Sequence, residues 1–404
     1  MALLGSGWTP RSDWTPKEYP ISFWCGPPAD MISVERYKQI AAAGFTHVMP
    51  HCQGAFSPDV NRKVLDTAKA TGLKAFIFDS RLPMSITGVP DAKSRLDAVV
   101  KDYAKHPALA GYWLTDEPNA SKFAGLGEVV AYLRAKDPAH PVYINIFPNY
   151  ADVPQLGAAT YAEYVDQYIQ TVKPFAVSYD HYHFLKAGDR TGFFSNIDTV
   201  RNLSAKNGLP FWQIVLSVPH GSYRPLTEAE KRWEAMQTLA YGGEGLMYFT
   251  YWTPSDKSFD WGPAIIKLDG TPTQQYEEVR RINHDVHAIG HYLINSAPVA
   301  VFQTGEIDQG GAPREQGTPV NVAGEPNLTV GIFRNDTHLY VLFTNRDYKA
   351  AVKVEALLSL GSNRPEHLDK ATGRWSEVHG TPGPDGETKV AVDLGAADGE
   401  LYRW

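Results

Sequence analysis

Two adjacent acidic residues stand at the end of an apolar run in the segment GYWLTDEPN, residues 111–119. Asp116 and Glu117 are followed by Pro118, which cannot continue a strand's hydrogen-bond ladder. Cleavage of a glycosidic bond needs two carboxyl groups, one to protonate the leaving oxygen and one to stabilise the oxocarbenium-like centre or activate water. Desolvation beside Trp113 and the like charge of Asp116 would keep a proton on Glu117. The alternative is an ion pair with arginines at a protein rim.

A second carboxyl group is offered by the segment FAVSYDHYHF, residues 175–184, in which Tyr179 and Asp180 end another apolar run. We expect Asp180 to be the catalytic partner of Glu117, with an ordinary hydrogen-bonding role as the alternative. A separation of about 5 Å between the two carboxyl groups would predict a retaining mechanism, and about 6.5–9.5 Å an inverting one. Asp79, at the end of an earlier run, is the next candidate.

Further polar and aromatic residues stand at or near the ends of apolar runs, where they would contact a substrate. The predicted substrate-binding residues are Asp116, Asp79, His51, Asn145, Tyr179, His181, Gln213 and Trp252. Each has a structural alternative, because buried polar groups pair within the protein and rings fill cores. Trp24, Tyr182 and Trp212 are also potential sugar platforms, and Trp252 is preferred among the rings.

Histidines near these acids leave a metal site open as an alternative. In the stretch HYH, His181 and His183 would lie on one face of a strand, and His51, Glu117 and Asp180 could complete a ligand set. This would suit a metal-dependent sugar isomerase or lyase. The preferred prediction has no metal and no cofactor. Cys25 and Cys52 might form a bridge across a rim, but two free thiols are expected for a cytoplasmic chain.

Eight short apolar runs, each followed by a polar segment and a helical pattern, must position these residues. The runs are Ile21–Cys25, Thr46–Pro50, Lys74–Asp79, Ala110–Thr115, Val142–Phe147, Phe175–Asp180, Phe211–Ser217 and Gly245–Trp252. Near-continuous apolar runs are typical of strands covered on both faces, and eight such units predict a (β/α)8 TIM barrel, whose active site lies at the carboxyl ends of the strands. A doubly wound sheet is the alternative, but no GxGxxG opens the first unit.

After Ser296 the pattern changes to short alternating segments separated by Gly, Pro, Asn and Asp clusters. This predicts a small all-β sandwich, with residues 304–326 as a loop. We therefore expect two domains, a catalytic barrel over residues 1–295 and a β-sandwich over 296–404.

The segment GYWLTDEP resembles the fourth-strand motif of TIM-barrel glycoside hydrolases, particularly the clan that includes β-galactosidases and cellulases. GLMYFTYW, residues 245–252, and GPAIIKLDGTPTQQYEEVRRINHDV, residues 262–286, resemble the eighth strand and last helix of those enzymes. The resemblance implies a glycoside hydrolase with Glu117 as general acid/base, and a β-sandwich after the barrel is common among such enzymes.

The seventh run departs from that family's pattern. The clan takes its nucleophile from a Glu ending the seventh strand, whereas LPFWQIVLSVPHG, residues 209–221, carries no carboxylate and has Gln213 inside it. Either this strand is misassigned or the second carboxylate comes from elsewhere. A Tyr-Asp pair ending the sixth strand is similar to chitinase-like barrels, but their DxxDxDxE pattern is absent. That resemblance therefore implies the geometry and not the substrate.

Composition bounds the remaining function classes. The 404 residues are 43% hydrophobic and 21% charged, with 12% aromatic residues, as in a globular protein with a large core. The net charge of −7 contains no basic block, which argues against a nucleic-acid partner. No run approaches the roughly 18 apolar residues of a membrane span, and Met1–Trp14 lacks the pattern of a signal peptide.

The sequence therefore predicts a soluble protein, cytoplasmic as written, or secreted or periplasmic if a signal peptide has been removed. Its expected partner is a carbohydrate, and the oligomeric state is not readable. A non-catalytic carbohydrate-binding barrel stays open because the seventh run has no Glu.

Overall fold

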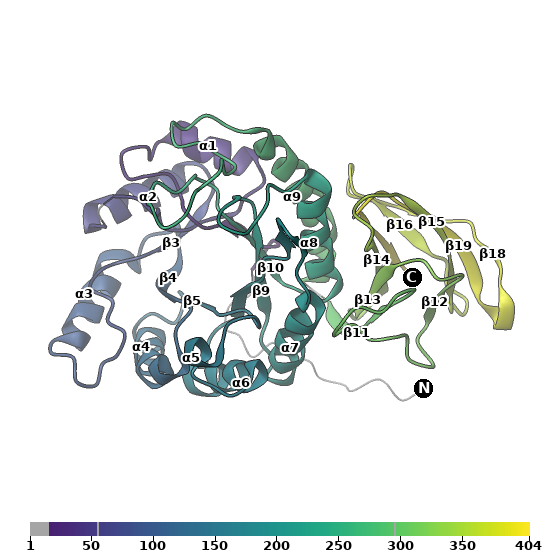
Figure 1. Ribbon diagram of the computed structural model, residues 1–404, viewed down its shortest axis with the longest axis horizontal. Coiled ribbons are helices and arrows are strands. Elements are labelled where there is room, and N and C mark those ends of the chain that lie inside the picture. The colour runs from purple at the N-terminus through teal and green to yellow at the C-terminus, as the bar shows by residue number, and fades with distance from the viewer. Residues whose placement is uncertain (1–15, 55, 295) are drawn as a thin grey trace.

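A parallel eight-stranded barrel followed by antiparallel sheets forms the architecture of this chain (Figure 1). The computed structural model describes residues 16–54, 56–294 and 296–404. The barrel strands are β1 (Ile21–Phe23), β2 (His47–Val48), β3 (Lys74–Ile77), β4 (Leu109–Asp116), β5 (Val142–Ile146), β6 (Val177–Asp180), β9 (Phe211–Leu216) and β10 (Gly245–Phe249). Every predicted run contains or overlaps one of them, so the predicted TIM barrel is confirmed.

Hydrogen bonds between the first two strands close the ring. The sheet runs in the order β1-β10-β9-β6-β5-β4-β3-β2. Thr46 N donates to Ile21 O over 2.9 Å, and Gly26 N donates to Pro50 O over 3.1 Å. The seventh barrel strand, β9, pairs in parallel with β6 and β10 along its length, so its assignment from sequence was correct.

Helices cover the outside of the barrel (Figure 1). They are α1 (Val34–Ala42), α2 (Pro58–Ala70), α3 (Ala92–Tyr103), α4 (Phe123–Lys136), α5 (Val153–Leu156), α6 (Tyr161–Val172), α7 (Phe193–Lys206), α8 (Glu228–Ala240) and α9 (Gln274–Leu293). At the start of α8, Thr227 and Glu230 form a capping box, in which each side chain accepts a hydrogen bond from the other residue's backbone N–H. None of the helices in the described ranges is long and apolar enough to cross a membrane.

Large side chains fill the barrel interior below its carboxyl end. Phe76, Tyr143, Trp212 and Met247 are all fully buried there. The interior is therefore a packed core, as in other TIM barrels.

Two antiparallel sheets follow α9 and enclose their own apolar core. The first runs in the order β11 (Ala297–Gln303), β13 (Leu328–Arg334), β14 (Leu339–Asn345), β20 (Gly399–Arg403), β16 (Glu366–Asp369) and β17 (Arg374–Glu377). The second runs β12 (Val320–Val322), β15 (Val352–Leu358), β19 (Thr388–Leu394) and β18 (Thr381–Pro382). The sandwich prediction is confirmed. The predicted loop 304–326 contains one short strand, because Val320 and Val322 are buried and pair with β15.

Helix α8 lies between the barrel and these sheets and packs against both, as Figure 1 shows. The indole Nε1 of Trp233 donates to the carbonyl of Arg346 over 3.0 Å. A Cβ atom built on Gly331 would lie 2.3 Å from the carbonyl oxygen of Ala240. Glycine in β13 therefore allows helix and sheet to approach closely.

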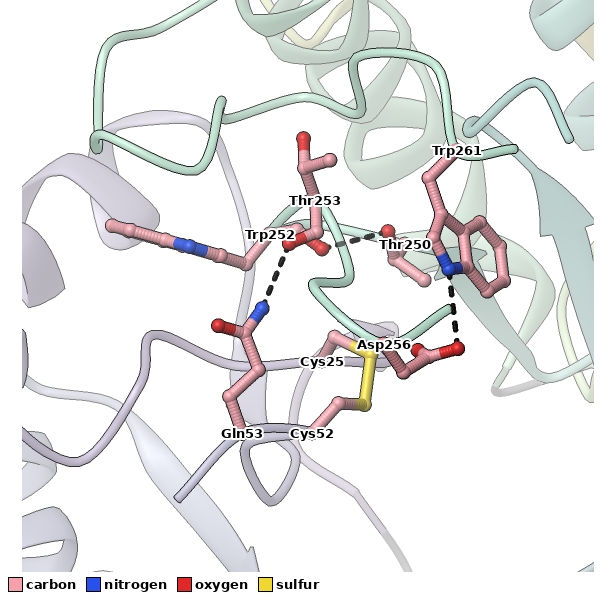
Figure 2. The surroundings of a disulfide bond; sticks show 8 residues. All are labelled: Cys25, Cys52, Gln53, Thr250, Trp252, Thr253, Asp256 and Trp261. Carbon is pink, nitrogen blue, oxygen red and sulfur yellow. Dashed lines mark hydrogen bonds between the residues drawn. A yellow bond between two sulfur atoms is a disulfide. The ribbon is translucent and has the colours of Figure 1, made fainter. Parts of the chain in front are cut away.

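Cys25 and Cys52 form a disulfide bond (Figure 2). The expectation of two free thiols was wrong. Gly26 pairs with His51 in a bridge just beyond β1 and β2, and this register places the two cysteine Cα atoms 4.7 Å apart. Disulfides span about 4.4–6.8 Å between Cα atoms and persist mainly in oxidising compartments.

Candidate active site

A cleft of about 380 Å³ opens at the carboxyl ends of the barrel strands. Asp116, Glu117, Asn145 and Asp180 lie on one side of it, at the ends of β4, β5 and β6. The sequence predicted all four as site residues, and the structure brings them together. This is the end of the barrel at which TIM-barrel active sites lie.

An irregularity in β4 turns its two terminal acids toward this cleft. Trp113 is the partner of Tyr143 in β5, but the next pairs are Thr115 with Ile144 and Asp116 with Asn145. One extra residue in β4 therefore shifts Asp116 into register with Asn145, as β-bulges commonly do beside active sites. Glu117 follows with a left-handed φ of 43° and donates its backbone N–H to Asn145 O over 2.9 Å.

Asn145 links the two aspartates of the cleft. Its Nδ2 donates to Oδ1 of Asp116 and to Oδ1 of Asp180, each over 3.0 Å. Its Oδ1 accepts a longer bond of 3.4 Å from the hydroxyl of Ser178. The amide therefore fixes the positions of two carboxyl groups that would otherwise repel each other.

Glu117 and Asp180 both line the cleft, and each shifts the pKa of the other. Desolvation raises the pKa of Glu117 well above its usual range, and the charges of Asp180 and Asp116 raise it further. Desolvation also raises the pKa of Asp180, but hydrogen bonds from Asn145, Glu117 and Tyr150 oppose that shift. The arrangement keeps the proton on Glu117 and the negative charge on Asp180.

Asp116 opens onto the cleft, yet dense protein on its other sides strips water from it. This desolvation raises the pKa of Asp116 to about 7, with a smaller contribution from the charge of Asp180. The bond from Asn145 acts in the opposite direction. A carboxyl group with such a pKa changes its charge near neutrality.

Tyr150 also lines the cleft, and the sequence analysis missed it. Its hydroxyl lowers the pKa of Asp180, and the guanidinium carbon of Arg190 lies 3.8 Å from its ring centroid. Arg190 Nη2 also donates to the hydroxyl of Tyr223 over 3.3 Å. Tyr150 stands four residues beyond the end of β5, so inspecting the loop after each strand would have found it.

Aromatic side chains form the rest of the cleft wall. Its lining includes Trp24, Tyr182, His220, Tyr223, Phe249 and Phe259. Tyr182 stacks on Phe249 with 5.5 Å between ring centroids, and Phe259 is 51% exposed at the rim. Rings of this kind can pack against the apolar faces of sugars. The sequence analysis named Trp24 and Tyr182, whereas the other four come from positions it did not consider.

Six predicted site residues lie outside the lining of the cleft, namely Asp79, Tyr179, Gln213, Trp252 and the histidines His51 and His181. Both oxygens of Asp79 accept hydrogen bonds from Arg81, at 2.9 and 2.8 Å, and Tyr103 donates to it as well. These bonds outweigh desolvation and lower the pKa of Asp79. The strand residues Tyr179 and Gln213 face α8. There the hydroxyls of Tyr179 and of Thr238, a residue of α8, both donate hydrogen bonds to Oε1 of Gln213. Trp252 is 1% exposed and packs near Arg36 instead of serving as a platform.

The predicted histidines are buried in separate aromatic surroundings. His51 stacks on Phe56 with 4.3 Å between ring centroids. His181 packs edge-on against Tyr150, and His183 stacks on Trp233. Across residues 16–54, 56–294 and 296–404, no three His, Cys, Asp or Glu side chains converge as metal ligands would. The metal-dependent alternative therefore has no ligand set in the described ranges.

Comparison with solved structures identifies the architecture, while no family model and no curated protein matches this sequence. A β-galactosidase from Bacillus circulans sp. alkalophilus superposes with a TM-score of 0.66 at 9% identity, covering 96% of this chain and 99% of that one. A glycoside hydrolase family 5 protein from Bacteroides vulgatus gives 0.58 at 10% identity, covering 96% and 88%. A β-galactosidase from Marinomonas ef1 gives 0.53 at 11% identity over 69% of this chain, which spans 62% of that structure.

At such low identities these matches establish the fold alone. They agree with the resemblance carried by the fourth-strand motif, including the sheets that follow the barrel. The chain is a TIM barrel of the kind found in solved glycoside hydrolases, followed by a β-sandwich.

Proposed function

We propose that this protein is a glycoside hydrolase that cleaves O-glycosidic bonds of an oligo- or polysaccharide, with Glu117 as the general acid/base. The observation that carries the proposal is the Glu117 carboxyl group beside two other carboxyl groups in an open cleft, where burial and like charge raise its pKa. An acid whose pKa is raised by burial and like charge is the proton donor that departure of a sugar leaving group needs.

Asp180 is assigned to the catalytic step through Glu117. The charge of Asp180 raises the pKa of Glu117. Asp180 is only 4% exposed, so it acts as a positioning residue that keeps the proton in place between turnovers. Asn145 in turn holds Asp180 through a hydrogen bond of 3.0 Å.

The rest of the cleft supplies surfaces for the sugar. Tyr182, Phe249 and Phe259 offer ring faces, and Asp116 offers a carboxyl group that opens onto the cleft. Rings stacked against the C–H faces of a sugar and a few placed hydrogen bonds are the usual composition of a small-molecule site.

One alternative has an observation in its favour. Because β9 ends without a carboxylate, a barrel that binds carbohydrate without cleaving it fits the same cleft. The Glu117→Gln variant separates the two functions. We expect hydrolysis to fall by at least about a hundredfold while binding of the oligosaccharide persists. Unchanged turnover in the variant contradicts the role of Glu117. Binding without turnover by the wild-type protein supports the non-catalytic barrel.

A further inference from the structure

A two-stranded hairpin follows β6 and borders the cleft. It consists of β7 (Phe184–Leu185) and β8 (Gly188–Asp189), which pair antiparallel. Leu185 also forms an antiparallel bridge with Tyr223, which lies in the loop after β9 and lines the cleft. The hairpin is therefore fixed to a loop that forms part of the cleft wall.

Arg190, which follows this hairpin, contacts three tyrosines of the cleft. Its Nε donates to the carbonyl of Tyr182 over 3.2 Å, and its Nη2 donates to the hydroxyl of Tyr223 over 3.3 Å. Its guanidinium carbon lies 3.8 Å from the ring centroid of Tyr150, well inside the range of a cation–π contact. The three tyrosines come from the loops after β6, β9 and β5. One side chain therefore joins three separate loops of the cleft wall.

The neighbouring Asp189 ties the hairpin to the loop after β9 a second time. Nη2 of Arg224 donates to Oδ1 of Asp189 over 3.3 Å, while Nη1 of Arg224 pairs with Glu230 of α8 at 2.6 Å. In both segments this contact lies one residue from the bond between Arg190 and Tyr223. Two adjacent contacts restrict rotation of the hairpin against the loop as well as their separation.

The β-sandwich reaches the same aspartate. Tyr348 lies in the segment between β14 and β15, and its hydroxyl donates to Oδ2 of Asp189 over 2.6 Å. Its ring packs edge-on against Phe184 of β7, with 5.3 Å between ring centroids. The start of this segment is anchored on α8, because Trp233 donates to the carbonyl of Arg346 over 3.0 Å. The segment is thus held by the barrel and holds the hairpin.

We propose that the β-sandwich takes part in substrate binding by positioning the wall of the cleft. Tyr348 holds Asp189, and the adjacent Arg190 keeps the three tyrosines in place. None of Tyr348, Asp189 and Arg190 belongs to the described lining of the cleft, so all three are positioning residues. A wall already held in its bound arrangement loses less conformational entropy when a sugar binds. The effect on substrate binding rests on the proposed function, whereas the mechanical coupling does not.

The contact between Tyr348 and Asp189 can be removed without unfolding the chain. The side chain of Asp189 is 34% exposed, and exposed polar contacts contribute little to the free energy of unfolding. Tyr348→Phe removes the hydroxyl and keeps the ring against Phe184. The substitution should therefore loosen the hairpin while the barrel and the sandwich stay folded.

The kinetic test uses the nitrophenyl glycoside that the wild-type protein cleaves best. In Tyr348→Phe we expect KM to rise about three- to tenfold with kcat nearly unchanged, because ground-state and transition-state binding weaken equally. Tyr132→Phe is the matched control, since Tyr132 donates a bond of 2.9 Å to Asp97 between α4 and α3, outside the cleft. A rise in KM of the same size in both variants, or in neither, would overturn the inference.

The Arg190→Lys variant tests the route of the coupling. Lysine keeps the charge but lacks the planar group that stacks on Tyr150 and the second donor that reaches Tyr223. We expect a larger rise in KM than in Tyr348→Phe, and the double variant should resemble Arg190→Lys alone, because both changes act along one route. Additive effects would show that Tyr348 does not act through Arg190 and would overturn the inference.

Hydrogen exchange measured by mass spectrometry gives a readout that needs no substrate. In Tyr348→Phe, peptides covering residues 184–190 and 220–224 should exchange faster than in the wild-type protein, whereas peptides of α3 and α4 should not. Faster exchange confined to the sandwich, or none at all, would overturn the inference. If the wild-type protein cleaves none of the glycosides, the proposed function fails by itself, and the exchange measurement still decides whether the sandwich holds the cleft wall.

Discussion

The amide nitrogen of Asn145 donates one hydrogen bond to Asp116 and one to Asp180, each 3.0 Å long. A single side chain on β5 thereby joins the carboxyl groups that end β4 and β6. Because both bonds favour the charged form of the acceptor, they lower the pKa values of both aspartates against the opposing effect of desolvation.

Replacing Asn145 by alanine should disturb the acid side of the pH profile. Without the amide, the pKa values of Asp116 and Asp180 rise, so the acidic limb of kcat/KM moves to higher pH. Loss of two buried hydrogen bonds should also lower the free energy of unfolding by about 1–3 kcal/mol. The measurement is a pH–rate profile beside thermal unfolding. A stability loss with an unmoved acidic limb would assign Asn145 a purely structural role.

The Asp180→Asn substitution should shift the alkaline limb of the pH profile of kcat/KM. The negative charge of Asp180 helps to raise the pKa of Glu117, second only to desolvation. Removing that charge lowers the pKa of Glu117, so the protonated acid is lost at lower pH and the alkaline limb moves downward. Asp79→Asn serves as the comparison, because Asp79 is bound to Arg81 outside the cleft. Asp79→Asn should lower the free energy of unfolding and leave the alkaline limb of the pH profile in place. An equal shift of that limb in both variants would contradict the role assigned to Asp180.

The cleft carboxyl groups should make the protein less stable as pH rises. Asp116 has a raised folded-state pKa of about 7, and that of Glu117 is also raised. Groups of this kind contribute stability that is complete below the unfolded pKa of about 4 and is lost as pH rises through the folded value. Glu117→Gln should therefore raise Tm at neutral pH by a few degrees and change it little near pH 4. Equal Tm shifts at both pH values would contradict the raised pKa.

Reduction of the disulfide should destabilise the rim of the cleft. Cys25 and Cys52 close a loop of 27 residues in sequence separation, for which chain entropy predicts about 3–4 kcal/mol of stabilisation. Gln53 beside the disulfide donates to the carbonyl of Thr253, which begins the segment that carries Phe259 and Trp261 (Figure 2). We expect a lower Tm and a higher KM in dithiothreitol, and the Cys25→Ser/Cys52→Ser variant should match it without reductant. Unchanged KM would separate the disulfide from the cleft.

The sequence predicted the barrel well because its strands are largely buried on both faces and therefore consist of nearly continuous apolar runs. The same property hides which side chains face inward. Tyr179 and Gln213 lie at strand positions that looked suitable for a substrate, but they face α8, and an all-apolar run gives no sign of this. Trp252 was predicted to end the eighth apolar run, but it lies beyond the end of β10.

The acidic motif was visible in the sequence, but its geometry was not. Adjacent Asp116 and Glu117 would alternate across a regular strand. The register shift in β4 places Asp116 opposite Asn145, and Glu117 follows the end of the strand with a left-handed φ of 43°. The contacts of Asn145 with two aspartates depend on the register of three strands. The disulfide depends on a bridge between Gly26 and His51, which local patterns do not contain.

Proton donation by Glu117 to the leaving oxygen is the central claim, and its most direct measurement is the dependence of rate on the leaving group. Aryl glycosides with leaving-group phenols of increasing acidity should be compared in wild-type protein and Glu117→Gln. The account predicts that the variant loses at least about a hundredfold in kcat/KM on the least acidic phenols and little on the most acidic, which depart without a proton. An equal loss across the whole series, or none, would contradict it.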